Sequence, residues 1–328
     1  MEQRTLGRTG RSVSVVGLGT WQLGADWGDV SEEAALQVLE AAVADGVTFF
    51  DTADVYGDGR SEQVIGRFLR SHPEIAVATK MGRRMDQVPE NYTLDNFRDW
   101  TDRSRRNLGV DTLDLVQLHC PPSAVIDADA TYDDLDRLVA DGAIAAYGVS
   151  VETADQALSA IARPNVASIQ IILNAFRLKP VDRVLPAAID AGVGIIARVP
   201  LASGLLSGKY DLDTTFADDD HRSYNRDGSA FDVGETFSGV DYATGVAASR
   251  EFAELVAESG LDVTPAQAAI AWVCQQPGVS SVIPGARNVD QAEANALAGS
   301  VPPLSDELTA AIARLYDDRV RARVHTRW

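Results

Sequence analysis

Short apolar runs alternate with amphipathic segments eight times along this chain, and this alternation constrains the fold more than any other feature. The apolar runs occupy residues 13–19, 47–53, 75–82, 113–120, 144–150, 168–176, 193–201 and 280–286. Each is followed by apolar residues at helical spacing, which indicates strand and then helix. No linker rich in proline, glycine or serine divides the units. The sequence therefore predicts an α/β protein, a single (β/α)8 TIM barrel in one domain over residues 1–328, in preference to two doubly wound halves.

Further segments lie outside this repeat. The sequence QRTLGRTGRSVSVV predicts a β-hairpin around Gly7 and Gly10 that closes the bottom of the barrel. Residues 203–244, after the seventh strand, form a connection much longer than usual, which is typical of a lid over a cofactor or substrate or of a disordered segment. An additional helical pattern at 264–276 precedes the eighth strand.

Composition excludes several classes of partner. The chain has 29 basic and 48 acidic side chains and a formal net charge of -19, which repels nucleic-acid phosphates and anionic lipid. The N-terminus lacks an apolar core with a cleavage site, and no stretch reaches about 18 uninterrupted apolar residues. We therefore expect a cytoplasmic protein with no nucleic-acid or membrane partner. Cys120 and Cys274 form neither a disulfide framework nor a metal motif, so we expect two buried thiols and no metal.

Four polar residues stand near the ends of consecutive predicted strands. Asp51 and Tyr56 follow the second strand, Lys80 ends the third and His119 ends the fourth. The carboxyl ends of barrel strands meet at one face, so these side chains can converge. An ammonium beside a phenol, whose unperturbed pKa is about 10, favours its ionised form and brings it closer to acting as a general acid near neutral pH. Asp51 can neutralise the buried lysine, and His119 can orient a carbonyl oxygen.

Taken singly, each of the four has a simpler interpretation. Asp51 fits a strand-end or turn carboxylate, and Lys80 fits a solvated loop charge. Tyr56 fits a half-buried surface aromatic, and His119 fits a satisfied polar cap. Their joint occurrence on neighbouring strand ends favours the catalytic interpretation.

The motifs around these residues resemble those of the aldo-keto reductases. FFDTADVYGDGRSEQVIG resembles the family's Asp-Thr-Ala and Tyr signature, and the resemblance continues over nearly the whole chain through ATK, VQLH, YGVS, QIILNAF, PLASGLLSGKY and SVIPGARNVDQAEANA. It implies that a nicotinamide cofactor delivers hydride to a carbonyl carbon while Tyr56 donates the proton. By the same resemblance Lys80 and Asp51 tune the tyrosine, and His119 orients the substrate.

The cofactor site is also implied by the resemblance. Gly17 and Gly19 suggest a dinucleotide fingerprint, but Gln22 replaces its third glycine and a barrel has no topological switch point. The resemblance instead places the nicotinamide carboxamide on Ser150 and Gln170, the pyrophosphate under the segment 201–209 and the adenosine on the last helix. The predicted cofactor-binding residues are Gly19, Thr20, Trp21, Ser150, Gln170, Arg198, Pro200, Leu201, Ser203, Gly204, Leu206, Lys209, Pro284, Gly285, Ala286, Arg287, Gln291 and Asn295.

Several positions decide the type of cofactor and the branch of the family. Arg287 near a helix N-terminus suits a 2′-phosphate, which predicts NADPH/NADP+ over NADH. Val151 stands where many members have Asn, and Arg198 stands where many have an aromatic residue against the nicotinamide. A guanidinium there should disfavour the positively charged oxidised cofactor and so favours reduction. With Gly285 after the proline of the eighth strand, the chain resembles bacterial members whose adenosine motif is of the GAR type.

The substrate is expected to be a small carbonyl compound. Trp21, Asp54 and Val55 are predicted to line the mouth of the barrel, and Trp21 fits a packing role equally well. The leading hypothesis is NADPH-dependent reduction of an aldehyde or ketone. The alternatives are an NADPH-binding regulatory or redox-sensor barrel with little turnover, and a phosphate-sugar enzyme that uses Lys80 as a Schiff-base amine. Monomer and homo-oligomer are both open.

Overall fold

The strands form a ring of parallel strands with a hairpin beneath it. The computed structural model describes residues 1–24 and 30–328. The hairpin pairs β1 (Gln3–Thr5) with β2 (Ser12–Ser14) in antiparallel register. The ring contains, in spatial and sequence order, β3 (Leu18–Gly19), β4 (Phe49–Asp51), β5 (Ala76–Met81), β6 (Leu115–His119), β7 (Tyr147–Ser150), β8 (Ser168–Ile172), β9 (Gly194–Arg198) and β10 (Val279–Val282).

The last strand returns to the first part of the chain. Parallel bridges join Val16 to Val282 and Gly19 to Gly285, so the ring of eight strands is nearly closed. The predicted (β/α)8 TIM barrel with an N-terminal hairpin is therefore confirmed.

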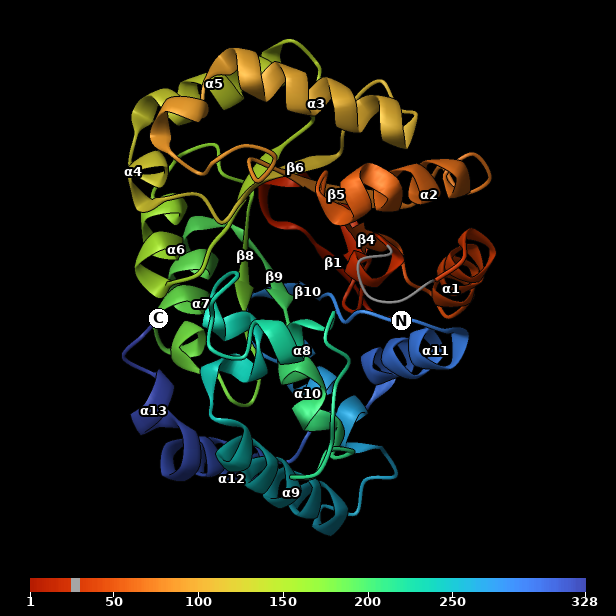
Figure 1. Cartoon of the computed structure of the whole chain (residues 1–328), viewed down its shortest axis with the longest axis vertical. Coiled ribbons are helices and arrows are strands. Elements are labelled where there is room, and N and C mark those ends of the chain that lie inside the picture. The colour runs from red at the N-terminus through yellow and green to blue at the C-terminus, as the bar shows by residue number, and fades with distance from the viewer. Residues whose placement is uncertain (25–29) are drawn as a thin grey trace.

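Helices surround the strands on the outside (Figure 1). Their local signals agree with their bounds: Thr153 forms a capping box at the start of α6, and Gly109 ends α3 in the left-handed conformation. The helices are α1 (Glu32–Ala44), α2 (Arg60–Phe68), α3 (Leu94–Leu108), α4 (Ser123–Ile126), α5 (Asp129–Ala140), α6 (Ala154–Ile161), α7 (Lys179–Ala191), α8 (His221–Tyr224), α9 (Tyr242–Glu258), α10 (Pro265–Cys274), α11 (Val289–Leu297), α12 (Asp306–Leu315) and α13 (Ala322–Val324).

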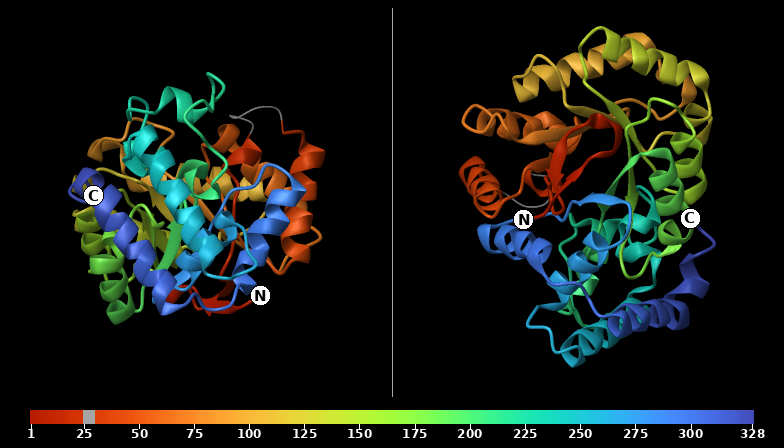
Figure 2. Two further views of the ribbon diagram at one scale, coloured as in Figure 1. Left: turned by 90° about the horizontal axis from the view of Figure 1, so that it is seen from below. Right: turned by 180° about the vertical axis from the view of Figure 1, so that it is seen from behind.

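The hairpin fills the bottom of the barrel, as the sequence predicts. Leu6 and Val13 are buried in an apolar cluster with Phe49, Leu115 and Ile196 from the barrel strands. The view from behind in Figure 2 shows the hairpin across this end, whereas Figure 1 shows α8 over the opposite end. One end of the barrel is thus closed by apolar packing, which leaves the other for chemistry.

Some predicted boundaries are wrong. α9 begins at Tyr242 because the Asp241 side chain accepts a hydrogen bond from the Thr244 amide at 3.0 Å, so the long connection ends at 241 rather than 244. α12, which packs against α9, was not predicted although Ser305 caps it. None of the described helices is long and apolar enough to cross a membrane.

Candidate active site

A cavity of about 650 Å³ opens where the barrel strands end. Its walls come from the ends of the strands β3 to β10, from the segment after β9 and from α11. This is the end at which a parallel barrel gathers side chains from separate strands.

Asp51 and Lys80 form a buried ion pair on one wall. Lys80 Nζ donates to Asp51 Oδ1 and, at 2.9 Å, to the carbonyl oxygen of Thr52. The second carboxylate oxygen of Asp51 accepts from Gln117 Nε2 at 3.1 Å and from Gln170 Nε2 at 2.7 Å. Burial disfavours the ammonium, but the Asp51 carboxylate and the Tyr56 oxygen together outweigh that effect, so the pKa of Lys80 is raised. Lys80 is therefore a fixed cation.

Tyr56 lies beside this pair and lines the cavity. Lys80 Nζ is 3.4 Å from the phenol oxygen, and the ring of Trp21 stacks on the Tyr56 ring with centroids 6.1 Å apart. Burial raises the pKa of Tyr56 above its usual 10.0, and the lowering by Lys80 only partly offsets it. The sequence predicts that Lys80 brings the pKa of Tyr56 closer to neutral pH. This prediction is wrong for the protein alone, because the desolvation of the phenol raises its pKa more than the ammonium lowers it.

His119 faces Tyr56 edge to face, with ring centroids 6.0 Å apart. Burial, followed by the positive charges of Arg83, Lys80 and Arg198, holds the pKa of His119 well below 6.5. The imidazole is consequently neutral near pH 7 and can donate from one nitrogen only. Its Nδ1 is buried and has no hydrogen-bond partner within residues 1–24 and 30–328.

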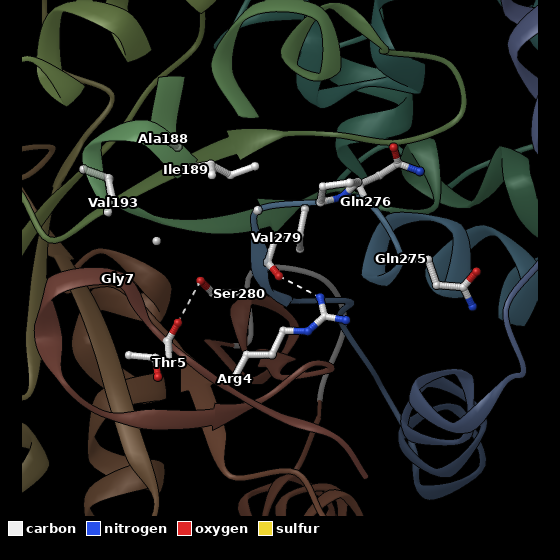
Figure 3. A pocket seen from close by; sticks show the side chains of 14 residues that line it. Arg4, Thr5, Gly7, Ala188, Ile189, Val193, Gln275, Gln276, Val279 and Ser280 are labelled. Atoms are coloured by element: carbon white, nitrogen blue, oxygen red, sulfur yellow. Dashed lines mark hydrogen bonds between the residues drawn. The ribbon is translucent and has the colours of Figure 1, made fainter. Parts of the chain in front are cut away.

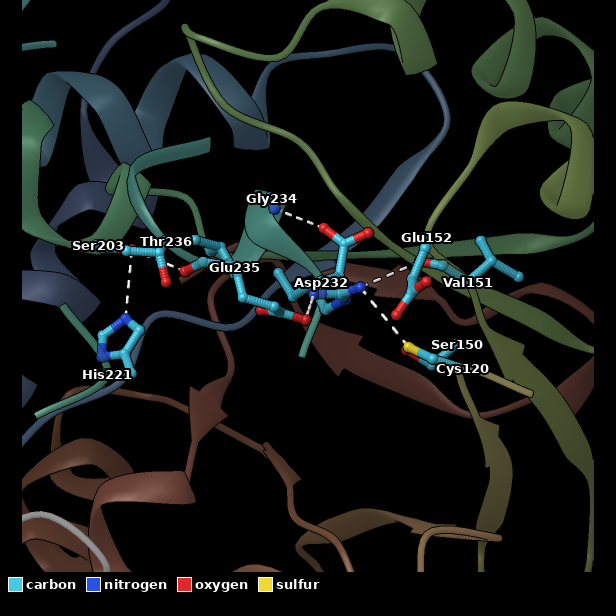
Figure 4. Close-up of polar contacts among 12 residues, drawn as sticks. Cys120, Ser150, Val151, Glu152, Ser203, His221, Asp232, Gly234, Glu235 and Thr236 are labelled. Carbon is cyan, nitrogen blue, oxygen red and sulfur yellow. Dashed lines mark hydrogen bonds and ion pairs between the residues drawn. The ribbon is translucent and has the colours of Figure 1, made fainter. Parts of the chain in front are cut away.

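Arg198 forms a second buried ion pair across the cavity. Its guanidinium pairs with Glu235 of the long connection. Arg198 Nη2 also donates to the Val151 carbonyl oxygen at 3.1 Å and to Cys120 Sγ at 3.7 Å. Glu235, Val151 and Cys120 lie together in Figure 4. Burial lowers the pKa of Arg198, but Glu235, with smaller contributions from Cys120, Glu152 and Asp232, reverses this, so the pKa is raised and the guanidinium stays charged but paired. Because Glu235 neutralises Arg198, we no longer expect the Arg198 charge to disfavour binding of the oxidised cofactor.

The long connection is tied to the cavity by its own contacts. The Ser203 hydroxyl donates to the Glu235 carbonyl oxygen at 2.8 Å and accepts from the Phe237 amide at 3.1 Å. His221 and Phe231 place their rings 5.6 and 6.0 Å from the Trp21 ring. The connection therefore covers part of the mouth with aromatic side chains.

The far end of the cavity is positively charged. Lys209, Arg222 and Arg287 line it, and Asp220 pairs with Arg222 and lies 3.9 Å from Arg287 Nη2. Side chains of α11 shape the turn before it: Gln291 accepts from the Arg287 amide at 2.9 Å, and Asn295 donates to the Gly285 carbonyl oxygen at 3.1 Å.

The backbone after β9 is strained. Val199, Ala202 and Ser203 have φ values of 56°, 47° and 57°, a region that β-branched residues in particular avoid. Such conformations cost on the order of 1–3 kcal/mol each and concentrate at binding sites. Asn174 Nδ2 holds the Val199 carbonyl oxygen at 2.8 Å and so supports the strained turn.

Most of the predicted site residues line this one cavity. The predicted catalytic residues Asp51, Tyr56 and His119 and the predicted substrate residues Trp21 and Val55 do so, while the predicted catalytic Lys80 contacts Asp51. The predicted cofactor-binding residues that line it are Gly19, Thr20, Trp21, Ser150, Gln170, Arg198, Pro200, Leu201, Ser203, Gly204, Lys209, Pro284, Gly285, Arg287, Gln291 and Asn295.

Other predicted site residues do not line the cavity. Leu206 and Ala286 are buried in the apolar core instead. Asp54 is fully buried beneath the Tyr56 turn, away from the cavity, and burial followed by the charge of Glu62 raises its pKa to about 7. The prediction that Asp54 contacts substrate is therefore wrong, because its side chain points into the protein.

The sequence interpretation missed Arg83, Cys120 and Glu235 as lining residues. Cys120 was expected to be a buried thiol, but it follows His119 with φ of 49° and is partly exposed. Cys120 directly follows β6 and Arg83 lies two residues after β5, and such a position is a usable signal in a barrel. No sequence pattern indicated that Glu235 lines the cavity, because it lies in an irregular segment far along the chain from Arg198.

A second hollow lies at the hairpin end of the barrel (Figure 3). Arg4, a charged residue that lines it, donates to the Cys274 and Val279 carbonyl oxygens at 2.7 and 2.8 Å. Arg4 thus joins the hairpin to β10, and this hollow is a packing feature.

Comparison with known proteins agrees with this arrangement. A model of the Aldo/keto reductase family matches residues 15–317. The chain is 28% identical over 300 residues to Aldo-keto reductase YhdN of Bacillus subtilis, covering 90% of this chain and 87% of that protein. It is 29% identical over 294 residues to Aldo-keto reductase yakc of Schizosaccharomyces pombe, whose name includes NADP(+), covering 87% and 83% of the two chains.

A solved structure of similar shape is the glycerol dehydrogenase from Gluconobacter oxydans, with a TM-score of 0.80, 30% identity and coverage of 97% of this chain and 96% of that one. Because the family match spans nearly the whole barrel and its cavity, the chain belongs to the aldo/keto reductase family.

Proposed function

We propose that this protein reduces an aldehyde or ketone to an alcohol with NADPH, and that Tyr56 donates the proton. The observation that carries the proposal is the placement of the Tyr56 hydroxyl on the cavity wall, 3.4 Å from a lysine that is itself held by Asp51. Neutral His119 lies across from the phenol. These groups form a proton donor, a fixed cation and a hydrogen-bond donor around one point, which suits a carbonyl oxygen.

The cavity residues fit a dinucleotide. Gln22 Oε1 is buried at the cavity wall without a hydrogen-bond partner in the described part of the chain, so a bound group that donates hydrogen bonds would satisfy it. Ser150 and Gln170 would hold the nicotinamide amide, and Lys209 and Arg287 would hold phosphate groups. The name of the S. pombe relative, which includes NADP(+), supports the same cofactor. When bound, the nicotinamide supplies hydride to the carbonyl carbon.

The residues of this chain supply the proton that the carbonyl oxygen receives. His119 and the Tyr56 hydroxyl donate hydrogen bonds to the carbonyl oxygen and polarise it. As the carbon is reduced, the Tyr56 proton moves to that oxygen and the alcohol forms. The Lys80 ammonium stabilises the resulting phenolate. The lysine stays protonated because the adjacent Asp51 carboxylate balances its positive charge. Solvent protons then restore the phenol.

Lys80 is poorly suited to be a Schiff-base nucleophile. Its side chain is 1% exposed, it donates to Asp51, and its pKa is raised, so a neutral amine is scarce. These contacts support the reductase over the phosphate-sugar enzyme considered from the sequence.

The test is the rate of NADPH oxidation with 4-nitrobenzaldehyde. We expect turnover by the wild type and a loss of about 100-fold or more in Tyr56→Phe, the scale of a general-acid contribution. Tyr132→Phe is the matched control, because it removes another largely buried hydroxyl, one that donates to the Ile126 carbonyl oxygen outside the cavity. Full activity in Tyr56→Phe contradicts the assigned proton donor. Tight NADPH binding without turnover of any aldehyde indicates the regulatory barrel instead.

A further inference from the structure

Lys80, Arg83 and Arg198 all bring positive charge to the part of the cavity around His119, whose pKa each of them lowers. Two of these cations are already engaged in short contacts with carboxylates. Lys80 donates to Asp51, and Arg198 donates to Glu235. Neither is available to a ligand without breaking a buried ion pair, which is costly.

Arg83 differs from the other two. It follows β5, lines the cavity, and its side chain is 24% exposed. Its ionic contact is a loose one: Nη2 lies 3.6 Å from Glu152 Oε1, beyond a normal hydrogen bond. Its Nε is buried and has no hydrogen-bond partner among the residues described. A guanidinium with unused donors beside the proposed reacting groups is a ready site for an anion.

The surrounding charges favour a carboxylate over a phosphate. The partly exposed Glu152 adjoins Arg83, whereas the charge of Glu235 on Arg83 is opposed by that of its partner Arg198. A singly charged, planar carboxylate matches the fork of a guanidinium, whereas a dianion meets stronger repulsion from Glu152. The side chain of Glu152 is 30% exposed, so it can turn to solvent when a ligand carboxylate binds.

We propose that Arg83 binds a carboxylate of the substrate, so that this reductase prefers carbonyl compounds that carry a carboxylate, the oxo acids in the broad sense. This inference rests on the proposed function, because it assumes that the carbonyl lies against Tyr56 and His119. Arg83 selects the substrate, and the chemistry at Tyr56 is unchanged by it.

The experiment compares kcat/KM for 4-carboxybenzaldehyde with that for its uncharged methyl ester. We expect the wild type to prefer the carboxylate by about 10-fold or more, the scale of a charge-assisted hydrogen bond, and Arg83→Gln to lose that preference while reducing the ester within about 3-fold of the wild type. Arg83→Lys should restore part of the preference. Arg98→Gln, which removes an exposed arginine of α3 paired with Asp141 at 3.0 Å, is the matched control. Equal kcat/KM for acid and ester in the wild type, or an equal loss of both in Arg83→Gln, overturns the proposal.

A binding measurement separates this proposal from the reductase activity itself. Calorimetric titration of 4-methylbenzoate into the protein saturated with NADP+ reports carboxylate binding without turnover, because this compound has neither a carbonyl group to reduce nor a hydroxyl group to oxidise. Weaker binding to Arg83→Gln by about 10-fold supports the site even where no aldehyde is reduced, and equal binding to both proteins overturns it. If the wild type reduces the acid and the ester with equal kcat/KM, the proposed reductase function stands and only the proposed carboxylate binding by Arg83 is contradicted.

Discussion

The two buried ion pairs of the cavity are built in different ways. Asp51 and Lys80 come from the adjacent strands β4 and β5, and two glutamines from β6 and β8 complete the contacts of Asp51. Arg198 comes from β9, but its partner Glu235 lies in the long connection. The first pair exists once the barrel has closed, whereas the second requires the connection to be in place as well. We therefore expect the strand-built wall to govern the chemistry and the wall built with the long connection to govern binding.

The largest effect is expected from breaking the strand-built pair. Lys80→Met leaves the Asp51 carboxylate buried without its cation, so kcat should fall by about 10²–10⁴-fold and the free energy of unfolding by about 3–5 kcal/mol. Initial rates and urea unfolding measure the two. The double variant with Asp51→Asn should recover much of the stability and none of the activity, and a variant Lys80→Met with near-normal kcat contradicts the assignment.

A smaller effect is expected at the nucleotide end, where Asp220 of the long connection lies 3.9 Å from Arg287. Arg287→Ala should raise KM for NADPH by about 10–100-fold, because it removes a charge-assisted contact to the 2′-phosphate. KM for NADH should stay within about 3-fold, since that cofactor lacks the phosphate. Equal changes for both cofactors, measured by initial rates, count against a 2′-phosphate contact.

The pair that includes the long connection should affect binding more than chemistry. In Glu235→Gln the Arg198 charge loses its partner and the connection loses an anchor, so the dissociation constant of NADPH should rise by about 10-fold as the competent state becomes less populated. kcat should change by less than about 3-fold. Fluorescence titration and limited proteolysis of the connection check this. Asp219→Asn, at an exposed acid in the same segment, is the control. A large fall in kcat with unchanged NADPH binding refutes the division between the two walls.

The smallest effect is expected from pH. The proposed reduction needs the protonated Tyr56 phenol, so the rate should fall as pH rises through its pKa, which burial raises above 10.0. His119 loses its neutral form only below its own pKa, which burial lowers well below 6.5. kcat should therefore change by less than about 3-fold from about pH 6.5 to about pH 9. A midpoint near neutrality in the profile of kcat against pH would falsify this account of the two groups.

Much of the site was predictable because strand ends in a barrel have fixed neighbours. Asp51, Tyr56, Lys80 and His119 lie at or just after the ends of consecutive strands, so the eightfold pattern and the motifs together placed them at one mouth. Asp54 was misplaced because the direction of its side chain depends on the turn at 52–56, which the strand period does not describe. Leu206 and Ala286 were misplaced because a segment that borders a cavity also has an inward face.

The sequence by itself determined the order of strands and helices, the apolar hairpin beneath them and the candidates for proton transfer, because hydrophobic period and motif are local properties of the chain. The tertiary structure alone decided the pairing of Arg198 with Glu235, the loose contact of Arg83 with Glu152 and the high pKa of Tyr56. These depend on distances between segments remote in the chain and on how far each charge is removed from water, and neither is encoded in a local pattern.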